Sequence, residues 1–156
     1  MAADRPNVLV IMSDQHRASV MGCAGDPAAN TPVLDRLARE GVRFPMAYCA
    51  APLCGPSRMS FLTGKHPWRT GVWDNYQTLN SDQPTYAHAL LAAGYDTALI
   101  GRMHFVGLDQ RHGFAERPVG DVPESVHLSA GWKLKSVLGD LADTPGSGVA
   151  TVTKSG

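Results

Sequence analysis

The sequence has no excess of charge of either sign, since fourteen Lys and Arg residues balance fourteen Asp and Glu residues. A nucleic-acid-binding domain normally carries a basic surface, so this balance argues against a nucleic-acid partner. No apolar run reaches the roughly eighteen residues that a membrane span needs, and no membrane contact is expected. The N-terminal segment also lacks a long apolar stretch before a small-residue cleavage site. The sequence therefore predicts no secretory signal and a cytoplasmic location.

Cysteine is also scarce, because the chain contains only Cys23, Cys49 and Cys54. An odd and sparse set of cysteines excludes a disulfide framework and leaves at least one free thiol. Apolar residues make up 44% of the chain and charged residues 18%, which favours a folded core. The length of 156 residues fits a single domain. The surroundings of each thiol must therefore decide its chemistry.

Strand-like and helix-like segments alternate along most of the chain. The patterns predict strands at 7–12 and 95–100, and helices at 31–41, 55–64 and about 84–93. A further strand at 42–48 would be broken by Pro45. The segment at 7–12, NVLVIM, is a continuous apolar run, which indicates a strand buried on both faces. This alternation is typical of an α/β fold with a parallel or mixed sheet and helices on its faces. Residues 142–156 are small and polar, and we expect a poorly ordered tail there.

Polar side chains follow two of the predicted strands. Asp14 and Gln15 come just after the strand at 7–12, and Arg102 and His104 come just after the strand at 95–100. In open α/β sheets, ligands bind at the carboxyl ends of the strands. Arg102 and His104 are two residues apart, so they can face the same side. Both segments are therefore candidates for a binding site.

Cys54 stands at the start of the predicted helix at 55–64. Pro56 favours the first turn of a helix, so Cys54 lies at or just before the helix N-terminus. Backbone N–H groups at such an end favour an anion or a nucleophilic atom. Arg58 lies about one turn further along, and its planar fork suits tetrahedral oxyanions. These residues favour a site for a phosphate or sulfate ester, although a lone cysteine is more often a small buried side chain.

The segment PLCGPSR at 52–58, followed by FLTG at 61–64, resembles the sulfatase signature C-x-P-S-R with its apolar tail. The segment NVLVIMSDQ at 7–15 is similar to the opening strand of that family. The segment GYDTALIGRMHF at 94–105 resembles its second signature, with Arg102 where lysine is usual. The segment VGLDQRHGFAER at 106–117 resembles members of the choline-sulfatase and phosphonate-monoester-hydrolase types. The resemblance covers the chain from about Arg5 to Arg117.

The resemblance implies that a formylglycine-generating enzyme oxidises Cys54 to formylglycine. One hydroxyl of the hydrated aldehyde then attacks sulfur, and the other later helps to expel the sulfate. Arg58 would brace this nucleophile, and Arg102 and His104 would contact the sulfate and the nucleophile. Arginine at 102 keeps the charge of lysine but is a poor proton donor. Asn75 would line the site, although a turn asparagine is an equal alternative.

The resemblance also implies a divalent cation held by Asp14, Gln15 and the modified Cys54. Ca²⁺ is the expected ion, with Mg²⁺ or Mn²⁺ as alternatives, because all three prefer oxygen ligands. In isolation, Asp14 and Gln15 would more simply form a solvated turn. His16 matches no ligand, and we expect it to be structural or exposed. We also expect structural roles for His66, His88, His112 and His127, and core packing, rather than a cage for a cationic group, for Trp68, Trp73 and Trp132.

The implied fold is an alkaline-phosphatase-like α/β sandwich with a mostly parallel sheet, of which residues 5–141 would form the N-terminal part. The implied substrate is a small sulfate ester, with phosphonate or phosphate esters as the alternative. A full-length member could form a homo-oligomer. The family completes its metal site with an Asp followed by Asn or His far downstream, and no such pair occurs in the last third of the chain. We therefore expect an inactive fragment of a hydrolase or, alternatively, a non-catalytic binding module that retains the signature.

Overall fold

The computed structural model describes residues 5–121 and 149–155. The chain divides into two units: Met1–Ser13 together with Cys49–Gly156, and Asp14–Tyr48. The first unit contains a β-sheet, and we call this unit the sheet unit. The second unit contains one α-helix.

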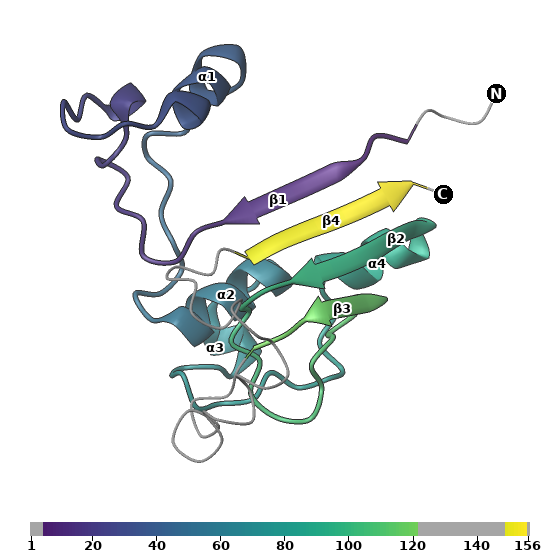
Figure 1. Ribbon diagram of the computed structural model, residues 1–156. Coiled ribbons are helices and arrows are strands. Elements are labelled where there is room, and N and C mark those ends of the chain that lie inside the picture. The colour runs from purple at the N-terminus through teal and green to yellow at the C-terminus, as the bar shows by residue number, and fades with distance from the viewer. Residues whose placement is uncertain (1–4, 122–148, 156) are drawn as a thin grey trace, which may run out of the picture. The chain divides into compact units, whose positions relative to one another are not determined.

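The sheet unit is built on four strands in the order β1-β4-β2-β3 (Figure 1). These strands are β1 Val8–Met12, β2 Tyr95–Ile100, β3 Glu116–Val119 and β4 Val149–Ser155. β4 is antiparallel to both β1 and β2, while β3 is parallel to β2. β1 and β2 therefore run in the same direction, and their carboxyl ends lie at the same edge of the sheet. The predicted α/β fold is confirmed, with a mixed sheet.

The sequence prediction gives β2 its observed bounds and β1 with one extra residue, but it misses β3 and β4. β4 lies where the sequence predicts a poorly ordered tail, and residues 142–148 of that prediction lie outside the described residues. The segment VATVTKS that forms β4 contains four β-branched residues, which favour extended structure. β3 contains Pro118 and pairs irregularly with β2 at the edge of the sheet. Pro is tolerated in such edge strands, which explains why the pattern of β3 is weak.

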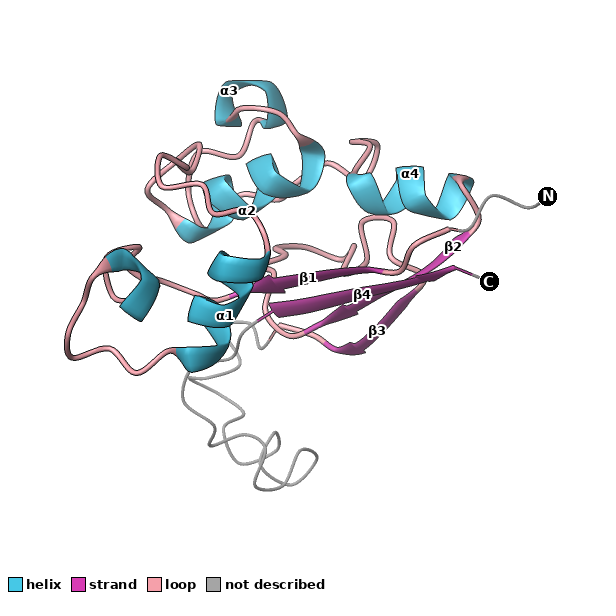
Figure 2. Cartoon of the chain, turned by 90° about the horizontal axis from the view of Figure 1, so that it is seen from above, coloured by secondary structure: helices cyan, strands magenta, loops and turns pink. Residues whose placement is uncertain are grey.

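Three helices lie on the same face of the sheet: α2 Cys54–Thr63, α3 Pro67–Thr70 and α4 Tyr86–Ala92 (Figure 2). The predicted helices at 55–64 and 84–93 are therefore confirmed, and α3 was not predicted. α2 ends at Gly64, whose φ of 68° is readily adopted only by glycine. α4 begins at Thr85, whose hydroxyl accepts a hydrogen bond from His88 N while His88 Nδ1 accepts one from Thr85 N. His88 thus has the structural role that we expect.

The core lies between these helices and the sheet. Its buried apolar residues come from α2, α4, β2 and the loops that join them: Met59, Leu62, Val72, Leu79, Ala87, Leu99, Met103, Phe105 and Phe114. Two aromatic edge-to-face pairs, Phe61 with Tyr86 and Tyr86 with Phe114, extend this core toward the surface. The core therefore fixes the start of α2 relative to the end of β2, which is where the candidate site residues lie.

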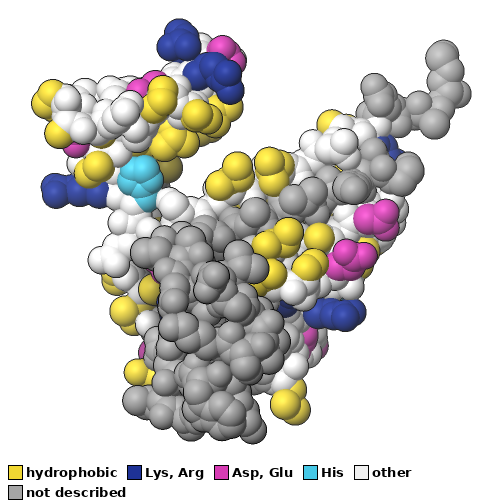
Figure 3. All heavy atoms as spheres, viewed as in Figure 1, with side chains coloured by type: hydrophobic (Ala, Val, Ile, Leu, Met, Phe, Trp, Pro, Cys, Tyr) yellow, Lys and Arg dark blue, Asp and Glu magenta, His cyan; other side chains and the backbone are white. Residues whose placement is uncertain are grey.

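The predicted burial of the first strand is wrong for this chain. Leu9 is 59% exposed and Ile11 is 74% exposed, and apolar side chains are visible on the surface along β1 (Figure 3). β1 is an edge strand, and α4 packs against β2 in the interior of the sheet. The predicted core packing of Trp68 and Trp73 is also wrong, because they are 60% and 58% exposed. Trp132 and His127 lie outside the described residues.

The unit Asp14–Tyr48 contains a short 3-10 helix, Gly22–Ala24, and α1 Pro32–Glu40. α1 begins after Thr31 and ends at Gly41, so the helix predicted at 31–41 is confirmed. Thr31 Oγ1 accepts a hydrogen bond from Gly22 N and donates one to Asp35, which ties the two helices together. The strand predicted at 42–48 does not form, because Pro45 interrupts it and every residue in it is exposed without a pairing strand.

Within residues 5–121 and 149–155, no helix is both long and apolar enough to cross a membrane.

Candidate active site

Cys54 is the first residue of α2, and its thiol is free and half-buried. The next residue, Gly55, is buried, and its N–H donates to Asn75 Oδ1 at 2.8 Å. Asn75 therefore satisfies one of the N–H groups that a helix start leaves without a partner inside the helix. A Cβ atom on Gly55 would lie 3.0 Å from the carbonyl oxygen of Asp74, so glycine permits this close approach. The 74–75 segment thus lies directly against the residue after Cys54.

Arg58 is 5% exposed, and its side chain connects α2 to the ends of two strands. Its Nη1 donates to the carbonyl oxygen of Arg102 at 2.9 Å and lies 3.7 Å from Met12 Sδ. Met12 is the last residue of β1, and Arg102 follows the end of β2. A buried guanidinium needs such acceptors to offset the loss of water. Arg58 therefore fixes the start of α2 at the carboxyl edge of the sheet.

Arg102 and His104 contact each other, as their spacing predicts. Arg102 Nη2 lies 3.1 Å from His104 Nδ1, and His104 Nε2 lies 2.9 Å from the carbonyl oxygen of Asn75. The guanidinium can only donate and the carbonyl can only accept. These partners therefore assign the neutral imidazole with its proton on Nε2. His104 adopts a φ of 62°, in the left-handed region.

A continuous series of hydrogen bonds connects Gly55, the residue after Cys54, to Arg102. It passes from Gly55 N to the Asn75 side chain, from the Asn75 carbonyl to His104, and from His104 to Arg102. The sequence singles out all of these residues except Gly55. The carbonyl group of Asn75 is the unexpected member, because no sequence motif specifies a backbone acceptor.

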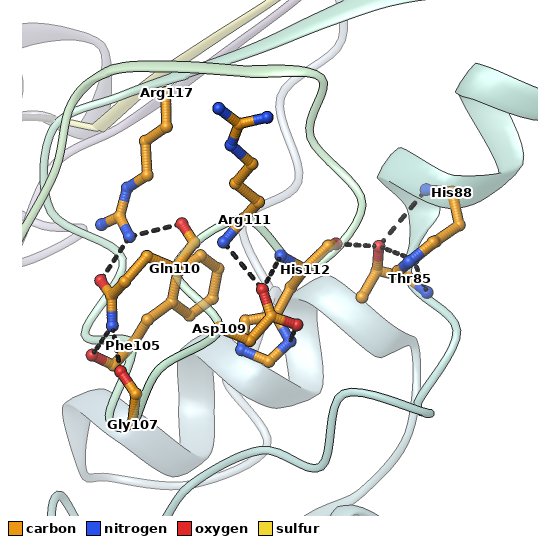
Figure 4. A network of polar contacts seen from close by, with 9 residues as sticks. All are labelled: Thr85, His88, Phe105, Gly107, Asp109, Gln110, Arg111, His112 and Arg117. Carbon is orange, nitrogen blue, oxygen red and sulfur yellow. Dashed lines mark hydrogen bonds and ion pairs between the residues drawn. The ribbon is translucent and has the colours of Figure 1, made fainter.

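Sequence reasoning missed the residues that bind the backbone on either side of His104. Asp121 accepts hydrogen bonds from Met103 N at 2.8 Å and from Phe105 N at 2.9 Å, and it pairs with Arg117 at 2.7 Å. The opposite charges of Arg117 and Asp121, four residues apart, were the available signal in the sequence. Figure 4 shows Arg117 beside Gln110 and Phe105 in this network.

His112 is 1% exposed and packs against the ring of Phe105, with ring centroids 4.5 Å apart. Its Nδ1 lies 3.3 Å from Asp109 Oδ2, but the geometry does not make a hydrogen bond. Burial lowers the pKa of His112, with help from His88 and Arg117, although the charge of Asp109 opposes this shift. Burial alone would raise the pKa of Asp109, but N–H donors of His112 and Arg111 hold it below its ordinary value (Figure 4). His112 is therefore a neutral, structural histidine.

The sheet unit should lose stability as the pH falls below 6.5, the ordinary pKa of histidine. The unfolded chain then takes up a proton at His112 while the folded chain does not, so protonation favours unfolding. The lowered pKa of Asp109 predicts a second loss below 3.8. Urea unfolding at about pH 7.5 and about pH 5 should show a smaller pH effect in His112→Gln than in the parent chain. The exposed His66 of the same unit serves as the control: if His66→Gln reduced the pH effect as much as His112→Gln, this interpretation would be wrong.

Asp14 and Gln15 begin the unit Asp14–Tyr48, and both are exposed. Gln15 has a φ of 51°, an unusual backbone conformation for a residue with a side chain. Among the residues that the structure describes, no three His, Cys, Asp or Glu side chains converge to hold a metal ion. Asp14 and Gln15 carry side-chain oxygen atoms, which are the ligands that Ca²⁺ and Mg²⁺ prefer.

Comparisons with known proteins agree on one family. The family model described as Sulfatase matches residues 6–143. The choline-sulfatase of Rhizobium meliloti is 40% identical over 98% of this chain and 31% of its own length. The N-acetylglucosamine-6-O-sulfatase of Bacteroides thetaiotaomicron is 43% identical over 68% of this chain and 19% of its own length.

A solved structure of a protein in complex with its substrate D-glucosamine-2-N,6-O-disulfate has a TM-score of 0.62 to this chain. It is 40% identical and covers 68% of this chain, which in turn covers 21% of that structure. The chain therefore spans less than a third of the length of each of these relatives.

Proposed function

This chain belongs to the sulfatase family, and we propose that it carries the nucleophile of a sulfuric ester hydrolase. The observation that supports this most is the hydrogen-bonded chain that leads from the start of α2 to Arg102. It puts a cation and an imidazole in one connected structure with the residue after Cys54. The alkaline-phosphatase-like α/β fold of the family fits the mixed sheet and its flanking helices.

In this proposal, Cys54 is oxidised by a formylglycine-generating enzyme, and the hydrated aldehyde supplies the attacking hydroxyl. The start of α2 offers the positive end of its dipole to the negative charge of the ester. Arg102 binds an oxygen of the ester, because its guanidinium carries a fixed positive charge. His104 accepts a hydrogen bond from Arg102 through Nδ1 and so orients that guanidinium. Arg58 holds the backbone of Arg102 in place.

Asp14 and Gln15 would hold one side of a divalent cation, for which their oxygen donors favour Ca²⁺. When bound, such a cation offsets negative charge on the ester and on the nucleophile. Among the described residues, no three His, Cys, Asp or Glu side chains converge on one point, so the proposal needs ligands besides Asp14, Gln15 and the modified Cys54. The proposed partners are a small sulfate ester and the enzyme that modifies Cys54.

The direct test is the hydrolysis of simple aryl esters by the protein as expressed from its gene, together with a formylglycine-generating enzyme. We expect turnover of 4-nitrophenyl sulfate to exceed that of 4-nitrophenyl phosphate and of a matched phosphonate monoester. A clear preference for either phosphorus ester would contradict the proposed substrate class. Turnover of none of the three esters, with Cys54 fully modified, would contradict hydrolysis itself and favour the binding-module alternative.

A further inference from the structure

We infer that Asp121 is a positioning residue, whose carboxylate clamps the backbone on both sides of His104 and so sets the geometry of the Arg102–His104 pair. The inference rests on the proposed function for its purpose, but its geometry stands alone. Oδ1 accepts from Met103 N at 2.8 Å, and Oδ2 accepts from Phe105 N at 2.9 Å. A single carboxylate thus holds the residue before His104 and the residue after it.

These two hydrogen bonds hold the backbone at a residue with an unusual conformation. His104 has a φ of 62°, a backbone conformation that residues other than glycine adopt uncommonly. Two hydrogen bonds to an ionised carboxylate are stronger and shorter than bonds between neutral groups. They fix the two flanking amides, and the imidazole between them is then aimed at its two partners, Arg102 Nη2 and the carbonyl oxygen of Asn75.

Arg117 holds the carboxylate itself in position. The Arg117 and Asp121 side chains are only 5% and 7% exposed, and Arg117 Nη2 donates to Asp121 Oδ2 at 2.7 Å. Arg117 Nη1 donates to the carbonyl oxygen and to Oε1 of Gln110, each at 2.6 Å. The side-chain amide of Gln110 in turn donates to the carbonyl oxygens of Phe105 and Gly107 (Figure 4).

The ring of Phe105 belongs to the same buried network, and we call Phe105, Gln110, Arg117 and Asp121 together the frame. The Arg117 guanidinium lies 4.9 Å from its centroid, and the His112 ring contacts it at a centroid distance of 4.5 Å. The N–H, the carbonyl group and the ring of Phe105 are therefore all engaged by residues that follow it in the chain. The residue next to His104 cannot shift without breaking several of these contacts. The frame thus transmits its rigidity to the Arg102–His104 pair.

The test is an NMR comparison of the chain with its variants Asp121→Asn and Glu116→Gln. Glu116 is an exposed acid on β3 and gives the matched control. In Asp121→Asn we expect amide hydrogen exchange at Met103 and Phe105 to accelerate by at least about tenfold, because the loss of one strong bond already corresponds to such a factor. We also expect the ¹⁵N shifts of His104 to move away from those of the Nε2–H tautomer. Exchange at Gly64, bonded to Ser60 in α2, should stay unchanged.

Unchanged exchange and an unchanged tautomer in a folded Asp121→Asn variant would overturn the inference, as would equal effects in Glu116→Gln. If Asp121→Asn does not fold, the same NMR measurements on the parent chain and on Arg117→Lys test the inference instead. The parent must show slow exchange at both amides and the Nε2–H tautomer. Arg117→Lys, which keeps the charge but loses the fork, must accelerate exchange at Phe105. Failure of either expectation overturns the inference. None of these signals needs a modified Cys54, a cation or an ester, so they are independent of the hydrolysis assay.

Discussion

In the protein as expressed from its gene, Cys54→Ala should lower the hydrolysis of 4-nitrophenyl sulfate by at least about a thousandfold, since loss of a covalent nucleophile typically costs that much or more. The methyl group keeps the small volume of the half-buried site, but without the thiol the side chain cannot be converted to the aldehyde whose hydrate supplies the attacking hydroxyl. The protein should be expressed with a formylglycine-generating enzyme and assayed beside its parent. The start of α2 and its hydrogen bond to Asn75 use backbone atoms of Gly55, so the fold should be unaffected.

Cys49→Ala is the matched control, because Cys49 is an exposed free thiol five residues earlier and belongs to the same unit. Its activity should equal that of the parent. Turnover by Cys54→Ala within tenfold of the parent would refute the nucleophile role of Cys54. An equal loss in Cys49→Ala would point to a general sensitivity of the segment.

The second large effect concerns stability: Arg117→Met should destabilise the sheet unit by about 3–5 kcal/mol, the usual cost of removing one partner of a buried ion pair. The variant would leave the Asp121 carboxylate, 7% exposed, without its cation. It would also leave two oxygen acceptors of Gln110 without their donor. The methionine side chain preserves most of the apolar volume, so the loss reports on the charge and its hydrogen bonds. Urea unfolding followed by tryptophan fluorescence or circular dichroism gives the free energy of unfolding.

Arg111→Met is the control, because Arg111 is exposed and its Nη1 makes a single bond to the carbonyl oxygen of Ala115 at 3.1 Å. Its loss should stay below about 1 kcal/mol, as for most surface substitutions. Losses of similar size in the two variants would contradict the claim that Arg117 stabilises the sheet unit through its buried contacts.

The sequence predicts the central elements well because their signals are local. Pro56 and Gly64 bracket α2, and the apolar run at 95–100 gives β2 its observed bounds. The proximity of Arg102 and His104 follows from a spacing of two residues after a strand. Cys54 and Arg58 come from one short motif. Their catalytic roles remain predictions, because the geometry describes their positions and not the reaction.

The remaining features depend on contacts between distant segments, which local patterns do not encode. The bonds from Asp121 to the 103–105 backbone cross sixteen to eighteen residues of chain. The exposure of Leu9 and Ile11 depends on which elements cover β1, and an apolar run cannot report that. Trp68 was expected in the core, but it stacks with His66 on the surface, with the Arg69 guanidinium over its ring. Each of these errors comes from the tertiary environment and not from the residue type.

The central claim is that the thiol at the start of α2 is the precursor of an aldehyde, and peptide mass spectrometry tests it most directly. After expression with a formylglycine-generating enzyme, the peptide that contains Cys54 should carry one oxygen in place of one sulfur and two hydrogens. The peptides that contain Cys23 and Cys49 should keep intact thiols and serve as internal controls. An unmodified Cys54 under conditions that fully convert a known sulfatase would contradict the account.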